Sequence, residues 1–337
     1  MKVLLYFEKQ NVIKQSGIGR ALVHQKKALE SAGIEYTLNP NDDYDIAHIN
    51  TLFSDSYRVL KKCKKKGIPV IVHGHSTVED FRNSFRLWTI AKIPFYHYMF
   101  KMYKNADYII TPTPYSKGLI ESYDGVNCKV YDISNGIDLN DYSYDQNAVD
   151  KFKKHFNIKT KHVIIGVGLF FERKGIMDFF KCAENFPDVT FIWFGHLNKL
   201  ITQIKINKAI RHRPKNVIMP GYISGDIIKG AFHSVDLLFF PSYEETEGIV
   251  VLEALASKLP VLVRDIGVYK PWLKDGISCY MGKNNGDFIN KIDYILNNDN
   301  SEIINNGYEV VKEKSIRNIG QELKKVYTEI MQKKDSN

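Results

Sequence analysis

The hydrophobic positions of this chain fall into short apolar runs that alternate with longer amphipathic stretches. Each apolar run is bounded by polar, glycine or proline residues, as expected of a buried strand, and the stretches between the runs favour helices. Strands separated by helical segments predict an α/β fold with parallel sheets. The predicted strands are residues 3–7, 46–49, 69–72, 107–111 and 129–134, then 163–167, 189–194, 216–219, 236–240 and 261–263.

The alternation stops once and then restarts, which divides the chain in two. Residues 138–155 are polar and lack a clear period, so we expect a linker there. A length of 337 residues also suggests two domains. We therefore predict a first domain at residues 1–155, a second at 156–315, and an amphipathic C-terminal helix within 316–337.

Composition excludes several classes of protein. Hydrophobic residues make up 44% of the chain, enough for sizeable cores, yet no run of about 20 apolar residues predicts a membrane span. The apolar start at residues 1–7 is too short for a signal peptide. Four scattered cysteines without CxxC spacing are typical of reduced thiols in a cytosolic protein. A net charge of +9 indicates an acidic partner or surface.

The most informative stretch is residues 241–253, PSYEETEGIVVLE, which follows the predicted strand 236–240. A helix begins near Gly248, and the free amides at its start can bind a phosphate. Glu245 and Glu253 flank that position, and carboxylates there are suited to accept hydrogen bonds from sugar hydroxyls. The stretch therefore favours a sugar-nucleotide site, although an acidic helix start would look similar.

Two further strand-to-helix turns carry candidate phosphate ligands. Gly17 and Gly19 follow the first strand, where backbone amides can approach a phosphate, although a Gly-x-Gly can also be a simple turn. Arg173 and Lys174 follow the strand at 163–167. An ordinary solvated helix start is the weaker explanation for them, because bases are disfavoured at a helix N-terminus. Two cations can neutralise a diphosphate leaving group without a metal ion.

The strand at 69–72 delivers His73 and His75 to its carboxyl end, where ligands bind in open α/β sheets. The two histidines lack an evident third metal ligand and could equally be ordinary loop residues. Asp43 and Asp45 form an Asp-x-Asp, but they precede a strand instead of closing one. We therefore expect no metal site.

The pair Glu245 and Glu253 resembles the paired-glutamate motif of retaining glycosyltransferases of family four, which have the GT-B fold. At Thr246 and Glu247 the sequence departs from the usual motif, in which a glycine and an aromatic residue are commoner. The resulting variant, Glu-Glu-Thr-Glu-Gly, is similar to that of the bacterial members that act on membrane glycolipids. The resemblance covers nearly the whole chain and includes Asn135-Gly136-Ile137-Asp138. It implies two Rossmann-like domains facing each other across a cleft, with the C-terminal helix crossing back to the first domain.

The resemblance also implies roles for individual residues. Glu245 would hold the donor sugar and Glu253 the ribose, while Arg173 and Lys174 would clamp the diphosphate with no cofactor or metal. His75 would lie near the outer hydroxyls of the sugar, with His73 as the alternative. The implied catalytic residues are His75, Arg173, Lys174 and Glu245, and the implied nucleotide-sugar ligands are Gly17, Arg173, Lys174, Tyr222, Ile223, Glu245, Glu247, Gly248, Ile249 and Glu253.

Residues 58–104 combine bases with aromatic residues and carry eleven bases against two acids, a net charge of +9. Such a mixture suits an interfacial helix on an anionic bilayer, or a helix with its aromatic residues in the core and its bases in solvent. We expect Pro94 to divide this stretch into two helices. The candidate membrane residues are Arg82, Arg86, Trp88, Lys92, Phe95, Lys101 and Lys104.

Several segments together resemble Gram-positive enzymes that add an α-hexose to diacylglycerol or to glucosyl-diacylglycerol, and we favour the second transfer. The implied partners are UDP-glucose or UDP-galactose, a glycolipid acceptor and the cytoplasmic face of an anionic membrane, with no nucleic acid. A cell-wall or capsular polysaccharide precursor is the alternative acceptor. A dinucleotide oxidoreductase is disfavoured because Leu22 stands where G-x-G-x-x-G needs its third glycine. The intact Glu245, Glu253, Arg173 and Lys174 argue against a non-catalytic membrane-binding protein.

Overall fold

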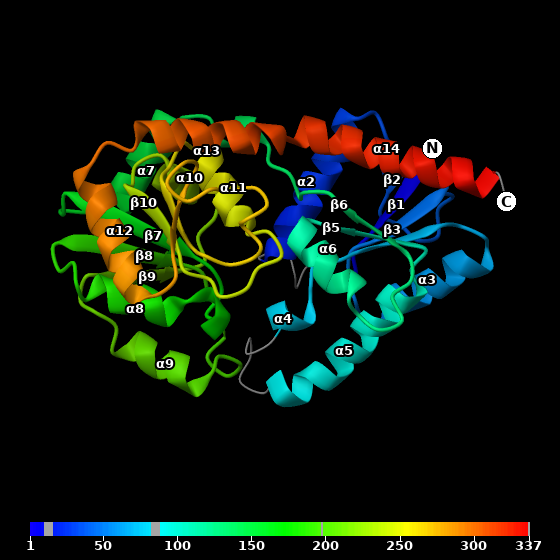
Figure 1. Ribbon diagram of the computed structural model, residues 1–337, viewed down its shortest axis with the longest axis horizontal. Coiled ribbons are helices and arrows are strands. Elements are labelled where there is room, and N and C mark those ends of the chain that lie inside the picture. Colours follow the sequence, from blue (N-terminus) through cyan, green and yellow to red (C-terminus); the bar gives the residue numbers. More distant parts are fainter. Residues whose placement is uncertain (10–15, 82–87, 197, 336–337) are drawn as a thin grey trace. The chain divides into compact units, whose positions relative to one another are not determined.

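The computed structural model describes residues 1–9, 16–81, 88–196 and 198–335 (Figure 1). The described chain forms two compact units, one from residues 1–81, 89–136 and 314–335 and the other from residues 137–313. Each unit contains a sheet of six strands, all of them parallel. The α/β fold with parallel sheets is therefore confirmed.

The first sheet has the strand order β2-β1-β3-β4-β5-β6. Its strands are β1 (Lys2–Tyr6), β2 (Glu35–Thr37), β3 (Ile46–Ile49), β4 (Val70–His73), β5 (Tyr108–Thr111) and β6 (Lys129–Asp132). The helices of this unit are α2 (Gly17–Ser31), α3 (Ser54–Lys65), α4 (Val78–Phe81), α5 (Trp88–Asn105), α6 (Pro114–Glu121) and α14 (Ile316–Asp335).

Both faces of the first sheet are apolar, because parallel strands are covered by helices on both sides. One face packs on Leu29 of α2 and Leu323 of α14. Helices α2 and α14 lie side by side (Figure 1). The other face packs on Leu60 of α3 and Met102 of α5. The C-terminal helix thus contributes to the core of the first unit.

The second sheet has the strand order β12-β11-β10-β7-β8-β9. Its strands are β7 (His162–Val167), β8 (Val189–Phe194), β9 (Val217–Gly221), β10 (Leu237–Phe240), β11 (Val261–Arg264) and β12 (Tyr280–Gly282). Its helical segments are η1 (Leu139–Tyr142), α7 (Gln146–Phe156), η2 (Glu172–Lys174), α8 (Ile176–Ala183), α9 (Ile204–Arg211), α10 (Asp226–Phe232), α11 (Ile249–Ala256), α12 (Asn285–Asn297) and α13 (Ser301–Glu313). Phe179, Trp193, Phe239 and Phe288 form an aromatic centre in its core.

Strand order reverses once in each sheet, and ligands of open α/β sheets bind at such reversals, outside the carboxyl ends of the strands. In the first sheet the chain runs outward from β1 to β2 and then returns to β3 on the other side of β1. In the second sheet it runs from β7 through β9 and then returns to β10. The segments after β1 and β3, and those after β7 and β10, are therefore the places to look for a site.

Two local expectations were wrong. Part of the expected linker at residues 138–155 forms α7, because Asp145 caps its first amides and Phe152 lies in the core, so the polar residues are its solvent face.

Helix α5 also continues through Pro94 instead of breaking there. The hydrogen bond lost at Pro94 is offset by the buried Met99 and Tyr103 in the turns that follow.

No helix among the described residues is long and apolar enough to cross a bilayer. All four cysteines are free thiols, and three of them are buried.

Candidate functional site

The loops after β7 and β10 are bound tightly to each other in the second unit. The amide of Tyr243 donates to the carbonyl oxygen of Arg173 at 2.6 Å. Gly175 has a φ of +73°, and a Cβ there would lie 2.3 Å from the carbonyl oxygen of Pro241. Only glycine allows this approach, which brings Arg173 and Lys174 to Glu245.

A cluster of charges results from this approach. The Nζ of Lys174 donates to Oε1 of Glu245, and a guanidinium nitrogen of Arg173 lies 3.8 Å from the same oxygen. Ser242 Oγ donates to that oxygen at 2.6 Å. Burial alone would raise the pKa of Glu245, but Lys174, Arg173 and Ser242 outweigh it and lower the pKa below its ordinary value. Glu245 is therefore ionised and buried, beside two cations.

The helix expected after this loop begins at Ile249, preceded by Gly248 with a φ of +83°. A Cβ on Gly248 would lie 2.9 Å from the hydroxyl of Tyr269. Glu253 lies one turn further along α11, is buried, and accepts a hydrogen bond from Tyr142 at 2.7 Å. The structure thus places Glu245 before the amino end of this helix and Glu253 within it.

Arg264 at the end of β11 supports the loop that carries Glu245. Its Nε donates to the carbonyl oxygen of Pro241 at 3.1 Å, and its guanidinium lies 3.8 Å from the ring centre of Tyr243. An ion pair between the buried Arg264 and the half-buried Asp178, also at 3.1 Å, fixes the guanidinium. Arg264 therefore holds the loop without belonging to any motif.

The remaining predicted nucleotide ligands of this unit differ in exposure. Tyr222 is exposed and Ile223 half-buried in the loop after β9. Glu247 is buried in the loop before α11, and Ile249, the first residue of α11, is half-buried. The loop after β9 leaves from the edge strand of the sheet, whereas the other ligands lie at its centre.

In the first unit, Gly17 is the first residue of α2 and is exposed. The side chain of Ser16 caps this helix by accepting from the amide of Gly19 at 3.4 Å. The structure therefore has the predicted strand, glycine turn and helix start, but residues 10–15 between them lie outside the described residues.

The two candidate histidines lie together at the carboxyl end of β4. Their rings stack at 3.9 Å between centroids, and both are buried. His75 Nε2 lies 2.9 Å from the side-chain oxygen of Asn50, which follows β3 at the reversal of the sheet. Burial lowers the pKa of His75 to about 3 and that of His73 well below its usual range. Both rings are therefore neutral.

A third histidine, missed in the sequence, extends this cluster. His48 on β3 lies with Nε2 3.1 Å from Nδ1 of His73 and with Nδ1 2.7 Å from the hydroxyl of Tyr327. Gln25 on α2 donates to His73 Nδ1 from 2.8 Å. The periodic pattern of the sequence marks His48, Tyr327 and Gln25 only as core-facing positions of a strand and two helices. These residues are too far apart in the chain for any sequence spacing to indicate that they meet.

The candidate membrane residues are only partly described. Arg82 and Arg86 lie outside the described residues, and Trp88 and Lys92 have undescribed side chains. Phe95 packs against the core of the first unit. Lys101 lies 5.5 Å from the ring centre of Tyr57, and Lys104 forms a 3.6 Å ion pair with Asp124. Some of the aromatic residues therefore face the core, and a membrane role for the segment stays a prediction.

One aspartate of the Asp-x-Asp segment at residues 43–45, Asp45, has a structural role. Asp45 accepts a hydrogen bond from the amide of Lys2 at 2.7 Å and so joins the starts of β3 and β1. Within the described residues, no group of three or more His, Cys, Asp or Glu side chains is arranged to hold a metal ion.

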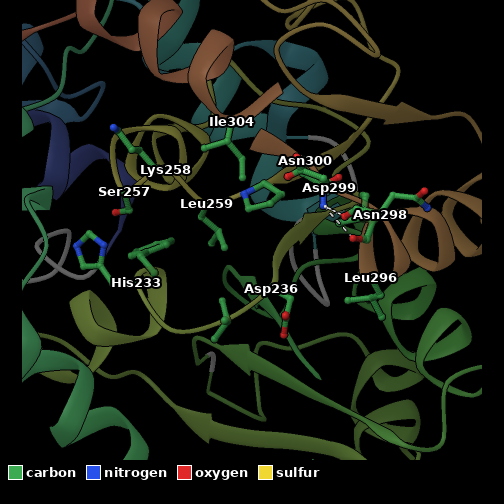
Figure 2. A pocket seen from close by; sticks show the side chains of 14 residues that line it. His233, Asp236, Ser257, Lys258, Leu259, Leu296, Asn298, Asp299, Asn300 and Ile304 are labelled. Carbon is green, nitrogen blue, oxygen red and sulfur yellow. Dashed lines mark hydrogen bonds between the residues drawn. The ribbon is translucent and has the colours of Figure 1, made fainter. Parts of the chain in front are cut away.

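A pocket of about 400 Å³ in the second unit is separate from this site (Figure 2). It lies at the amino ends of the strands, whereas the predicted site lies at their carboxyl ends, because Asp236 precedes β10 and Pro260 precedes β11. His233, Lys258 and Asn300 line it. None of the residues predicted for sugar-nucleotide binding contributes to this pocket.

Comparisons with known proteins agree with this geometry. A family model described as "Glycosyl transferases group 1" matches residues 148–310, and one described as "Glycosyltransferase Family 4" matches residues 36–141. A processive diacylglycerol alpha-glucosyltransferase from Acholeplasma laidlawii is 54% identical over 98% of this chain and 99% of its own length. An alpha-galactosylglucosyldiacylglycerol synthase from Streptococcus pneumoniae is 25% identical, over 80% of this chain and 73% of that protein.

Solved structures with low sequence identity share the fold. An Anabaena protein in complex with UDP and glucose has a TM-score of 0.78 at 16% identity, covering 97% of this chain and 99% of that one. A glycosyltransferase from Rickettsia africae has a TM-score of 0.70 at 14% identity, covering 98% of both chains. The GT-B fold expected from the sequence is thus confirmed.

Proposed function

This chain belongs to the family of glycosyltransferases that includes the processive diacylglycerol glucosyltransferase of Acholeplasma laidlawii, and we propose that it transfers glucose from UDP-glucose to a diacylglycerol-based lipid. The observation that carries the proposal is 54% identity over nearly the full length of both chains. A processive enzyme uses its own product again, so glucosyl-diacylglycerol is the acceptor of the second transfer. Glucose is favoured over galactose because the relative named for galactose is only 25% identical.

The charge cluster supports a metal-independent reaction. Lys174 and Arg173 already share one carboxylate oxygen of Glu245, so a diphosphate can take over these cations when UDP-glucose binds. The cations then stabilise the negative charge that develops as UDP leaves. Glu245 is released to accept a hydrogen bond from a glucose hydroxyl, and Glu253 accepts one from the ribose.

We further propose that the product retains the α configuration of the donor. Glu245 is ion-paired and hydrogen-bonded through Oε1, an arrangement that suits a positioning role better than nucleophilic attack. The departing phosphate oxygen would take the proton of the acceptor hydroxyl on the face where the new bond forms. No covalent glycosyl-enzyme is needed in this route.

Lipid acceptors require the enzyme to reach a membrane surface, and we propose that the basic part of the first unit does so. Three exposed bases lie on and just after α3: Lys61, Lys65 and Lys66. The ammonium groups of Lys61 and of Lys101 on α5 both lie over the ring of Tyr57. Bases near an anionic surface contribute roughly 1 kcal/mol each, weakened by salt.

Product analysis tests the proposal. The protein is incubated with UDP-glucose or UDP-galactose and with anionic vesicles that contain diacylglycerol or glucosyl-diacylglycerol, with and without EDTA. Mass spectrometry should find mono- and then diglucosyl lipid from UDP-glucose, unaffected by EDTA, and anomeric proton coupling should identify an α linkage. A β linkage would refute retention, and sugar transferred only to a polysaccharide precursor would refute the lipid acceptor.

A further inference from the structure

Three buried side chains of the first unit form a hydrogen-bonded series that begins on the C-terminal helix. The hydroxyl of Tyr327 on α14 lies 2.7 Å from Nδ1 of His48 on β3. His48 Nε2 lies 3.1 Å from Nδ1 of His73 on β4. All three side chains are at most 2% exposed, so water cannot replace these contacts without rearrangement of the core.

The chemistry of each group fixes the direction of the series. Burial raises the pKa of Tyr327, so its hydroxyl keeps its proton. His48 Nδ1 is the partner that the structure gives to this proton, and donation to it avoids leaving a buried O–H unpaired. His48 is neutral because burial lowers its pKa to about 3, so its single proton is on Nε2. That N–H then donates to His73 Nδ1.

Gln25 completes the assignment at His73. Its amide nitrogen lies 2.8 Å from His73 Nδ1 and can only donate, so this ring nitrogen accepts from Gln25 and His48 in a shared, three-centre arrangement. The proton of the neutral His73 is then on Nε2. Among the described residues, neither His73 Nε2 nor Gln25 Oε1 has a hydrogen-bond partner, although both side chains are at most 3% exposed.

One donor and one acceptor, buried in two adjacent side chains, define the ligand that they can take. Buried polar groups are nearly always hydrogen-bonded, and each unpaired one is costly. A hydroxyl both donates and accepts, so hydroxyl groups match the chemistry of both atoms. An anion cannot donate to Gln25 Oε1, and a neutral histidine offers no charge to hold a phosphate.

We propose that Tyr327, His48 and Gln25 are positioning residues that fix the proton of His73 on Nε2, so that His73 and Gln25 together bind a substrate hydroxyl. The position fits this role, because His73 stacks on His75, which contacts Asn50 at the reversal of the sheet. The proposal rests on the proposed function only in taking the hydroxyl from the sugar or from the lipid. The C-terminal helix thereby acts together with α2 to set the protonation of a residue at the end of β4.

Tyr327→Phe removes the hydroxyl and keeps the ring, and Leu323→Ala provides the matched control. Leu323 lies one turn earlier on the same buried face of α14 and belongs to the apolar core of the first unit. Long-range ¹H–¹⁵N spectra of protein labelled at histidine report which ring nitrogen carries the proton. Tyr327→Phe should abolish the single Nε2–H form of His48 and lower kcat about tenfold, the effect of one buried hydrogen bond. Because Gln25 still donates to His73 Nδ1, loss of the single Nε2–H form of His73 should require Gln25→Leu together with Tyr327→Phe.

Leu323→Ala should lower Tm but leave both protonation patterns, and kcat below its Tm, unchanged. The proposal fails if Tyr327→Phe leaves the pattern of His48 intact, if Gln25→Leu together with Tyr327→Phe leaves that of His73 intact, or if Leu323→Ala alters them equally. These spectra need no turnover, so they test the series even if the proposed reaction is wrong.

Ligand additions identify the source of the hydroxyl. UDP, UDP-glucose and micellar glucosyl-diacylglycerol are added separately while the Nε2–H signal of His73 is followed. A shift with UDP-glucose but not UDP assigns the hydroxyl to the sugar, and a shift with the glycolipid assigns it to the lipid. If no addition moves the signal, or if UDP alone moves it, the pair holds a structural water or responds to the diphosphate, and the substrate role is refuted.

Discussion

Both units place polar side chains at the carboxyl ends of their parallel strands, but those of the second unit are charged and those of the first unit are neutral. In the second unit, Lys174 and Arg173 lie beside the ionised Glu245, and Arg264 holds the loop that carries Glu245. In the first unit, His48, His73 and His75 are neutral, His48 is hydrogen-bonded to His73, and His75 stacks on His73. A charged site suits a diphosphate and a neutral one suits hydroxyls.

This difference also shows how each site is supported. The charged cluster depends on close approach of two backbone loops, with Gly175 against Pro241. The neutral cluster depends on side chains from α2, β3, β4 and α14 that meet in the core. Changes in charge should therefore affect turnover in the second unit, whereas changes in burial and pH should affect the first.

The largest effect should come from Lys174→Ala. Loss of one cation from the leaving group should lower kcat by about 10²-fold or more, on the scale of removing one electrostatic donor from a transition state. Transfer from UDP-glucose to the lipid measures the loss. Lys181→Ala, which removes an exposed lysine of α8, is the control. Equal turnover of Lys174→Ala and wild type would show that the diphosphate binds elsewhere.

The next effect concerns the membrane. Replacement of Lys61, Lys65 and Lys101 by Ser should weaken sedimentation with anionic vesicles at low salt by up to about 100-fold, given roughly 1 kcal/mol per base. A control variant removes three exposed bases of the second unit, Lys208, Arg211 and Lys215. Equal losses in both variants would mean that net charge, and not this surface, controls binding.

A backbone test compares two glycines with nearly the same φ. Gly175→Ala should lower the free energy of unfolding by more than about 2 kcal/mol, because left-handed strain adds to a clash with Pro241. Gly276→Ala, with φ at +71° and no neighbour within 4 Å of its Cβ, should cost only about 1 kcal/mol. Denaturant titration measures both, and equal costs would exclude the close approach of the two loops.

Several features of this comparison were predictable from the sequence. Apolar runs located the strands, and the residues after them located Glu245, Glu253, Arg173, Lys174 and His75, because parallel strands bring their carboxyl ends to one edge. The periodic patterns did not reveal α7, whose apolar face is narrow. They also could not connect His48 with Tyr327, which are 279 residues apart and look like ordinary core positions. Arg264 resembles any base at a strand end until its contacts are seen.

The smallest effect should appear in the pH dependence of stability. Burial lowers the pKa of His48 to about 3, whereas an unfolded histidine titrates near 6.5. Unfolding therefore takes up a proton as pH falls below 6.5, so stability is lost between pH 6.5 and about 3. Between pH 6.5 and 5.5 this loss is about 1 kcal/mol per histidine.

His48→Gln should remove the contribution of one histidine, about 1 kcal/mol, from the loss of unfolding free energy between pH 6.5 and 5.5. Denaturant titrations at these two pH values measure that loss. Substitution of the exposed His97 provides the control for replacement of a histidine as such. An unchanged slope in His48→Gln would mean that His48 is not held neutral in the folded protein.

Calorimetric titration with UDP alone tests the division between the two sites most directly, because UDP has the diphosphate but neither the hexose nor the lipid. We predict that Lys174→Ala weakens UDP binding at least about tenfold, the loss of one charge-assisted contact. Tyr327→Phe should leave UDP affinity unchanged while lowering turnover. UDP affinity that survives Lys174→Ala, or that falls equally in Tyr327→Phe, would contradict a charged site for the diphosphate and a neutral site for hydroxyls.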